Sequence, residues 1–328
     1  MSGLRLNLLL VLVLLGLLAL GLLLGETPLS GAQYAQAFTD PASAPGEILW
    51  TIRAPRAVAA AVVGGALGLA GAVMQGLLRN PLADPGVLGV SAGAGLGAAL
   101  AIALGLAATP GGTEVAALMA ALATGLLLTA LAARFREPET LILFGVALSA
   151  FAGALTALIF NLSPSPVTTA EILSWLMGSV ANRGWNDIGR EILPMAAGAG
   201  LCVYAARGLV MLTLGEETAA LSGLPMGRLR AAAVAGAALL TGAAVAMAGI
   251  IGFVGLAAPH LVRAGAGADP GRTLTPSALA GAALLVAADV AARMIPTDQE
   301  LKLGVVTALF GAPLFALIAW RAARSWRA

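Results

Sequence analysis

Long apolar runs, rather than alternating or amphipathic patterns, dominate this chain. The first run, Leu6–Leu24, contains no charged residue, and several later runs extend for about 20 residues, the length that a helix needs to cross a bilayer. The first run is longer than the roughly 7–15 apolar residues of a signal peptide, and no small-residue cleavage motif follows it closely. We therefore expect an all-α membrane protein whose first run is a span rather than a leader.

The number of spans depends on Ala231–Val262, which carries no charge over 32 residues. This stretch is too long for one ordinary span and short for two, and Gly249 and Gly252 offer a break near its middle. Arginines crowd the C-terminus, and Arg5 stands near the N-terminus without an acid, so the positive-inside rule places both ends in the cytoplasm. Two cytoplasmic ends require an even number of spans, and dividing this stretch into two short helices gives ten.

One transmembrane domain is therefore expected over residues 1–328. Its expected spans lie at about 6–25, 57–78, 87–108, 113–133, 141–162, 191–213, 229–248, 249–264, 276–296 and 303–320. This topology places 12 of the 18 Lys and Arg residues on the cytoplasmic side, which supports the orientation. The outer side holds Arg53, Arg56, Arg183, Arg190, Arg293 and Lys302.

The two halves of the chain look related. Segments beginning at Arg56 and Arg230 each open a Gly/Ala-rich helix, and each helix leads to a proline-containing break, Asn80-Pro81-Leu82 and Ala258-Pro259-His260. Five spans per half would place the halves in opposite orientations, an arrangement that is common in transporters. We expect two inverted five-helix halves, although alanine-rich sequence also produces such matches by chance.

Composition narrows the possible chemistry. Only 10% of the residues are charged, and no basic cluster indicates nucleic acid binding. One cysteine, Cys202, and one histidine, His260, are too few for a bare transition-metal site, so a metal that passes through is expected to be wrapped in a chelator. A lone histidine near a helix end is more often a cap or packing residue than a ligand. No phosphate-binding loop motif is present, so we assign no catalytic residue, no metal site and no cofactor to this chain.

Two alternatives to a transporter subunit remain open. An intramembrane enzyme or an ion-coupled secondary transporter would need ionisable residues at mid-span. Asp289 is the only good candidate, and no nucleophile–base pair accompanies it.

Several motifs together identify a family. The segment Arg79–Gly86 contains two prolines that forbid a continuous helix, although a tight interfacial hairpin would explain it equally well. The remaining motifs are Arg53-Ala-Pro-Arg56, Gly71-Ala-Val-Met-Gln75, Gly89-Val-Ser-Ala-Gly93, Gly252-Phe-Val-Gly-Leu-Ala-Ala-Pro-His260, the pair Asp289 and Arg293, and Gly304-Val-Val-Thr-Ala-Leu-Phe-Gly-Ala-Pro313. In this order and spacing they resemble the FecCD family, the permease subunits of ABC importers for ferric siderophores, haem and cobalamin.

The resemblance implies a ten-span permease that works as a homodimer in a bacterial inner membrane. It implies two cytoplasmic ATPase subunits, which hold the ATP and Mg²⁺, and a periplasmic substrate-binding protein that delivers a metal chelate. By family abundance alone we rank ferric siderophore first, haem second and cobalamin third.

The resemblance also assigns roles to three outer arginines. Arg53, Arg56 and Arg293 match positions that receive carboxylates from the binding protein, and a guanidinium fork suits that task. Snorkelling to lipid headgroups is the alternative, and Arg293 stands four residues after Asp289, a spacing that permits an intrahelical ion pair.

A cytoplasmic coupling helix is expected at about 215–224. Gly215, Glu216, Ala219, Gly223 and Leu224 match the segment that seats in a groove of the ATPase in this family. An ordinary interfacial loop is the alternative.

The gate and the periplasmic mouth complete the expected site. Asn80 and Leu82 match the cytoplasmic gate, and a second constriction is expected at Pro138 and Glu139, where the chain lacks the small hydroxyl residues of the cobalamin permease. Beyond the fifth span, a short helix around Glu171–Gly178 is expected near the mouth. Trp175, Arg183 and Trp185 are expected to contact either substrate or binding protein there, or to form an interfacial belt.

Overall fold

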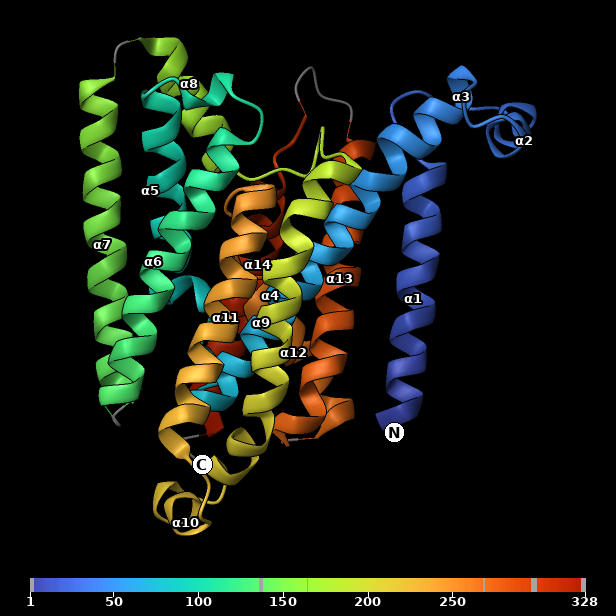
Figure 1. The fold of residues 1–328 in the computed structure, drawn as a ribbon. Helices are drawn as coiled ribbons and strands as arrows, with labels where there is room; N and C mark the ends of the chain where they lie inside the picture. The colour runs from blue at the N-terminus through green and yellow to red at the C-terminus, as the bar shows by residue number, and fades with distance from the viewer. Residues whose placement is uncertain (1–2, 136–137, 164, 268, 296–299, 326–328) are drawn as a thin grey trace.

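The computed structural model describes residues 3–135, 138–163, 165–267, 269–295 and 300–325, and all regular structure among them is helical (Figure 1). The elements are α1 Gly3–Leu23, α2 Gly31–Thr39, α3 Ala44–Glu47, the π-helical turn η1 Ile48–Arg53, α4 Ala54–Leu77, the 3₁₀ turn η2 Pro85–Leu88, α5 Val90–Ala103, the 3₁₀ turn η3 Leu106–Ala108, α6 Gly112–Arg134, α7 Pro138–Leu162, α8 Pro166–Leu176, α9 Trp185–Leu212, α10 Glu216–Leu221, α11 Met226–Ala248, α12 Val254–Ala266, α13 Pro270–Met294 and α14 Leu303–Ser325.

Each expected span coincides with a helix, but the helices differ in their capacity to cross a membrane. In the described part of the chain, seven helical segments are long and apolar enough to do so, and α5 and the 303–317 part of α14 are shorter apolar helices. Helix α12 has 13 residues, which is about 20 Å of helix and short of a 30 Å hydrocarbon core. The chain is therefore a multi-pass membrane protein, and the full count of ten crossings stays a prediction.

Helix α4 forms the centre of the bundle, and small residues allow neighbouring helices to approach it closely. It lies against α13 at a crossing where a side chain added at Gly64 or Gly68 would overlap the backbone of Gly281 or Ser277. Without a hydrophobic driving force in lipid, such close backbone contact is a main source of helix association. Helices α9, α11 and α12 also contact α4, whereas α1 and α7 lie at opposite margins of the bundle (Figure 1).

The chain breaks its helices at two places. The first break follows α4, where Arg79 adopts a left-handed φ of 48° before η2. The second follows α11, where Phe253 has a φ of 67° and residues 249–253 are not helical. This corrects the expected second break at residues 258–260, because Pro259 lies inside α12. The turn at Gly249 and Phe253 ends the preceding helix before the proline is reached.

Hydrogen bonds beside the second break join the chain after α8 to two other helices. Ser179 N donates to the carbonyl of Ala248, the last residue of α11, at 2.7 Å. Gly304 N at the start of α14 donates to the carbonyl of Met177, the C-cap of α8, at 3.1 Å. The segment after α8 therefore contacts both the end of α11 and the start of α14.

The helix at the expected second span begins well before the apolar run at 57–78. A continuous helical segment covers Ala44–Leu77, because Ser43 caps α3 through Gly46 N at 3.3 Å and η1 joins it to α4. Helix α2 precedes it and begins at Ser30 with a reciprocal capping box to Gln33. Neither α2 nor α3 was expected from the hydrophobic pattern.

The two ends of the bundle carry different elements. The start of α1, the end of α14 and α10 lie at one end, and α2, α3 and α8 lie at the other (Figure 1). We call these the α10 end and the α8 end. Both chain termini thus share one side, as the distribution of arginines predicted, and its assignment to the cytoplasm stays a prediction.

Candidate functional site

Three arginines and two carboxylates form a cluster at the α8 end, which we call the arginine cluster: Arg53, Arg56, Asp289, Arg293 and Glu300. Arg56, in the first turn of α4, donates from Nε and Nη2 to Asp289 Oδ1 at 3.0 and 2.9 Å. It also donates to Glu300, which precedes α14. Asp289 is fully buried on α13 and receives Arg293 Nη2 on its other oxygen at 3.0 Å. Arg56, Arg293, Asp289 and Glu300 thus share an ion-pair network, and Arg53 adds a cation beside it whose hydrogen bonds go to Tyr34 and to backbone carbonyls.

The other contacts of Arg53 and Arg293 cap the end of α1. Arg293 Nη1 donates to the carbonyls of residues 21 and 24, both at 3.1 Å, and Arg53 Nη1 donates to those of residues 22 and 23 at 2.9 and 3.2 Å. The last carbonyls of a helix have no partner within it, and cations are favourable beside them. The two arginines therefore satisfy the carbonyls of residues 21–24, at the end of α1 and just beyond it, and the hydroxyl of Tyr34 also donates to the carbonyl of Leu23 at 2.6 Å.

Burial separates the three arginines that were expected to dock a binding protein. The Arg53 residue and the Arg293 side chain are each 4% exposed, whereas the Arg56 side chain is 13% exposed and that of its partner Glu300 is 25% exposed. The three arginines that the sequence singled out lie near one another, and their docking role stays a prediction. The sequence did not indicate that Arg53 and Arg293 are already engaged with α1, nor that Glu300 belongs to the cluster.

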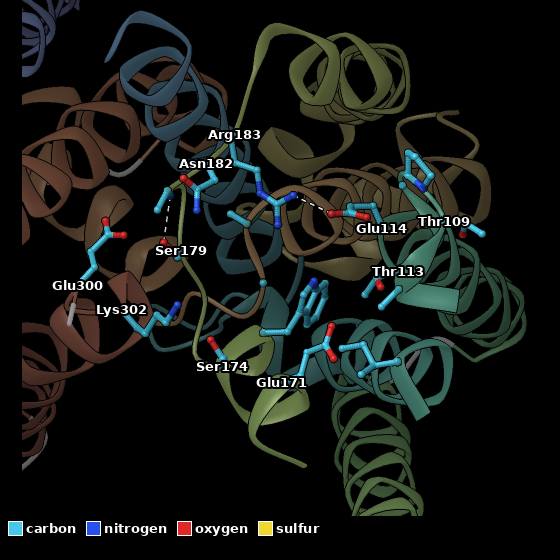
Figure 2. Close-up of a pocket in the computed structure, with 18 residues that line it drawn as sticks. Thr109, Thr113, Glu114, Glu171, Ser174, Ser179, Asn182, Arg183, Glu300 and Lys302 are labelled. Atoms are coloured by element: carbon cyan, nitrogen blue, oxygen red, sulfur yellow. Dashed lines mark hydrogen bonds and ion pairs between the residues drawn. The ribbon is translucent and has the colours of Figure 1, made fainter. Parts of the chain in front are cut away.

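A cavity of about 470 Å³ opens beside this cluster at the α8 end. Arg183 Nη1 pairs with Glu114 on α6 at 2.7 Å, and Figure 2 shows Glu171 and Ser174 of α8 on a second wall and Glu300 and Lys302 on a third. Trp175 also lines this space. The lining mixes cations, carboxylates and hydroxyls, so it suits polar, hydrated groups.

The expected mouth residues are divided between two places. Trp175 and Arg183 line the cavity, but Trp185 lies outside its lining, 50% exposed at the start of α9. Its Nε1 donates to the carbonyl of Trp50 at 3.0 Å. Trp185 therefore joins the start of α9 to the turn before α4 instead of completing one mouth with the other two.

The break after α4 is held by its own side chains. Asn80 Oδ1 accepts from Leu82 N at 2.9 Å, so this amide stabilises the turn, and Leu82 is half-buried. Asp84 accepts from Gly86 N at 2.7 Å and from Leu256 N in the first turn of α12. Burial raises the pKa of the Asp84 carboxyl above its usual range, and these two hydrogen bonds offset part of that effect. Asp84 thus links the two breaks, a role that sequence analysis missed.

The second expected constriction lies at the start of α7. Pro138 begins this helix, and Glu139 in its first turn is exposed. The break after α4 packs on α7 further along, where Gly89 approaches Gly145 and Leu148. A joint gate of Asn80, Leu82 and Glu139 stays a prediction.

Helix α10 occupies the expected coupling segment, with one correction. Gly215 and Gly223 flank it in left-handed conformations, with φ of 102° and 76°, and Leu224 is half-buried. Ala219 is fully buried within the permease, so it does not present a surface to a partner. Leu221 is 87% exposed at the tip of the helix. The side chain of Glu216 lies outside the described part of the structure.

The described residues offer little for bond-breaking chemistry. Cys202 is buried and free, and no group of three or more His, Cys, Asp or Glu side chains among these residues is placed to hold a metal ion. Asp289, the mid-span candidate for enzymatic or ion-coupled chemistry, is occupied by two arginines. The site is one of ion pairs, helix caps and a polar cavity.

A multi-pass helical bundle with interrupted helices is an architecture that many membrane transport proteins share. Comparison with known proteins agrees: the FecCD transport family matches residues 9–321, and the chain belongs to this family. It is 39% identical to the vitamin B12 import system permease protein BtuC of Vibrio cholerae, over 95% of this chain and 92% of that one. It is 42% identical to the uncharacterized ABC transporter permease protein YvrB of Bacillus subtilis, over 85% and 80%.

A solved structure has the same fold. It is described as an inward-facing conformation of a metal-chelate type ABC transporter, with a TM-score of 0.84 and 30% identity, covering 97% of this chain and 99% of that one. The chain is therefore an ABC importer permease, a transport subunit, of the FecCD family.

Proposed function

We propose that two copies of this chain form the membrane path of an importer for a bulky metal chelate in a bacterial inner membrane. The family match over residues 9–321 carries this proposal. Two cytoplasmic ATPase subunits bind at the α10 end and supply ATP hydrolysis. A periplasmic binding protein docks at the α8 end and releases the chelate into the path.

We propose cobalamin ahead of the iron chelates as the cargo, and similarity to vitamin B12 permeases supports this order. BtuC proteins of Vibrio and Salmonella are 39–41% identical over at least 87% of this chain. This order reverses the ranking by family abundance, which put ferric siderophore and haem first. An iron chelate is the second candidate, supported by the structural similarity to a metal-chelate type transporter.

Three regions of the chain are proposed to serve coupling to the ATPase, gating of the path and entry of the substrate. The exposed Leu221 at the tip of α10 is proposed to enter a groove of the ATPase, with Gly215 and Gly223 setting the angle of the helix. The break at Asn80 and Leu82 is proposed to close the path at the α10 end, together with Pro138 and Glu139 of α7. The cavity beside Arg183 is proposed to line the periplasmic mouth.

Uptake into proteoliposomes tests the proposal. The permease is reconstituted with its ATPase and its binding protein, and entry of labelled cyanocobalamin, haemin and ferrichrome is measured with and without ATP. We expect ATP-dependent entry of cyanocobalamin, and none when the ATPase carries a substitution in its phosphate-binding lysine. Entry of haemin or ferrichrome alone would transfer the assignment to an iron chelate, and ATP-independent entry of any of them would contradict an ABC importer.

A further inference from the structure

The three arginines of the arginine cluster are not equivalent. The Arg53 residue and the Arg293 side chain are each 4% exposed, and both guanidinium groups donate to carbonyls of residues 21–24 at the end of α1. Helices α1 and α7 are the least buried of the membrane-length helices in the described part of the chain. Helix α1 lies mainly against α13, and the two arginines tie its end to α13 and to the turn before α4. Withdrawing Arg293 would remove the donor that the carbonyls of Gly21 and Leu24 share, and Gly21 is buried.

Arg56 differs because it has two carboxylate partners of unlike exposure. Asp289 is fully buried and is shared with Arg293, so it is a fixed partner. Glu300 is 25% exposed and pairs only with Arg56 among the described residues. Glu300 also lines the cavity at the α8 end, so its carboxylate stands where the bundle meets solvent.

We propose that Glu300 is an internal competitor for Arg56, holding its guanidinium in the undocked permease and yielding it to a carboxylate of the binding protein. This inference rests on the proposed function, because it needs a protein that docks at the α8 end. It makes Arg56 the docking cation and assigns Arg53 and Arg293 to the anchoring of α1.

The exchange follows from the energetics of buried ions. Without Glu300, Arg56 and Arg293 would share the single negative charge of Asp289, and the uncompensated cation would carry a desolvation penalty in this partly buried site. A resident carboxylate removes that penalty before docking. An incoming carboxylate then gains only the difference between two similar ion pairs, which favours reversible docking over tight capture.

The experiment measures both the contact and its competition with docking. Permease–ATPase complexes in nanodiscs are treated with phenylglyoxal, which modifies arginine, and labelling is followed by mass spectrometry. We expect Glu300→Gln to speed the labelling of Arg56 by roughly threefold or more while Arg53 and Arg293 are unchanged. The cognate binding protein, obtained by its co-purification with the complex, should bind Glu300→Gln by a similar factor more tightly.

Glu171→Gln is the matched control, because it removes the same charge from the same cavity without touching Arg56. Glu300→Asp keeps the charge but shortens the reach by one methylene, and should act in the same direction as Glu300→Gln. Tighter docking should vanish in an Arg56→Ala background. Equal labelling of Arg56 in wild type and both Glu300 variants would overturn the inference, as would tighter docking that persists without Arg56. A wild-type complex that docks no binding protein would instead count against the proposed function, and the labelling result would still decide the Glu300 contact.

Discussion

At the scale of single residues, Asp84 connects the break after α4 to the start of α12, two elements that are far apart in the sequence. It accepts from Gly86 N beside the first break and from Leu256 N in α12 after the second. Burial nevertheless disfavours its charged form and raises its pKa above the ordinary carboxyl value. For an acid whose pKa is raised by folding, the folded state binds the proton more readily than the unfolded state. Stability is therefore lost as pH rises through the raised pKa and regained as pH falls through it.

Replacing Asp84 should change how stability depends on pH. In Asp84→Asn we expect the gain in melting temperature between neutral pH and the ordinary carboxyl range to shrink, because the titrating group is gone. Thermal unfolding of the detergent-solubilised protein across that range measures the slope. Asp269→Asn is the control, because Asp269 accepts from Gly271 N at 2.8 Å in the same turn geometry but at a more exposed site. Equal slopes in wild type and Asp84→Asn would contradict the expectation.

At the scale of elements, close helix crossings hold the broken helices in place. Gly71 of α4 faces Gly255 in the first turn of α12, and a side chain at Gly71 would overlap the carbonyl oxygen of Gly255. The short α12 therefore depends on glycine in its neighbour. Sequence analysis selected Gly71 as part of a motif, but only the crossing explains why a larger residue does not fit.

Gly71→Ala should separate α4 from α12. Overpacking of a close contact costs about 1–3 kcal/mol, so we expect a clear fall in melting temperature and in transport. Gly153→Ala on α7 is the control, because the space around Gly153 is open. A Gly71→Ala variant as stable as Gly153→Ala would show that the crossing relaxes without cost.

Helix α10 gives a second prediction at this scale. Because Ala219 is buried inside the permease, a large residue there would damage the permease itself, and the exposed Leu221 is the better probe of coupling. We expect Leu221→Ala to weaken ATPase binding by roughly five- to tenfold, the effect of losing an apolar anchor, with little change in melting temperature. Leu143→Ala, also an exposed leucine, should leave ATPase binding unchanged. Normal binding in Leu221→Ala would return 215–224 to an ordinary loop.

At the scale of the whole molecule, the proposed dimer brings two copies of each break toward one axis. Leu82 is half-buried in the single chain and stands on the break at the end of α4. Apolar side chains meeting at an axis close a path by packing and dewetting. The proposed gate is thus a property of two chains, and a single chain shows only its half.

Cysteine cross-linking tests this arrangement. Leu82→Cys in a Cys202→Ser background should form a symmetric disulfide in the resting complex, and ATP or docked binding protein should alter the yield. Gel mobility under non-reducing conditions measures it. An active dimer that never cross-links in any state would assign the break a structural role and move the gate toward Glu139.

The sequence by itself determined the membrane class, the family and the position of nearly every helix, because apolar length and glycine–proline breaks are local signals. It also selected Arg53, Arg56 and Arg293, which do meet in space. Only the tertiary structure decided what Arg53 and Arg56 contact, because residues 22 and 23 lie far from Arg53 in the chain, and Asp289 and Glu300 lie far from Arg56. Burial of Ala219, the separation of Trp185 from Trp175 and the link through Asp84 were likewise tertiary outcomes, since a side chain's partners depend on how helices cross rather than on where they begin.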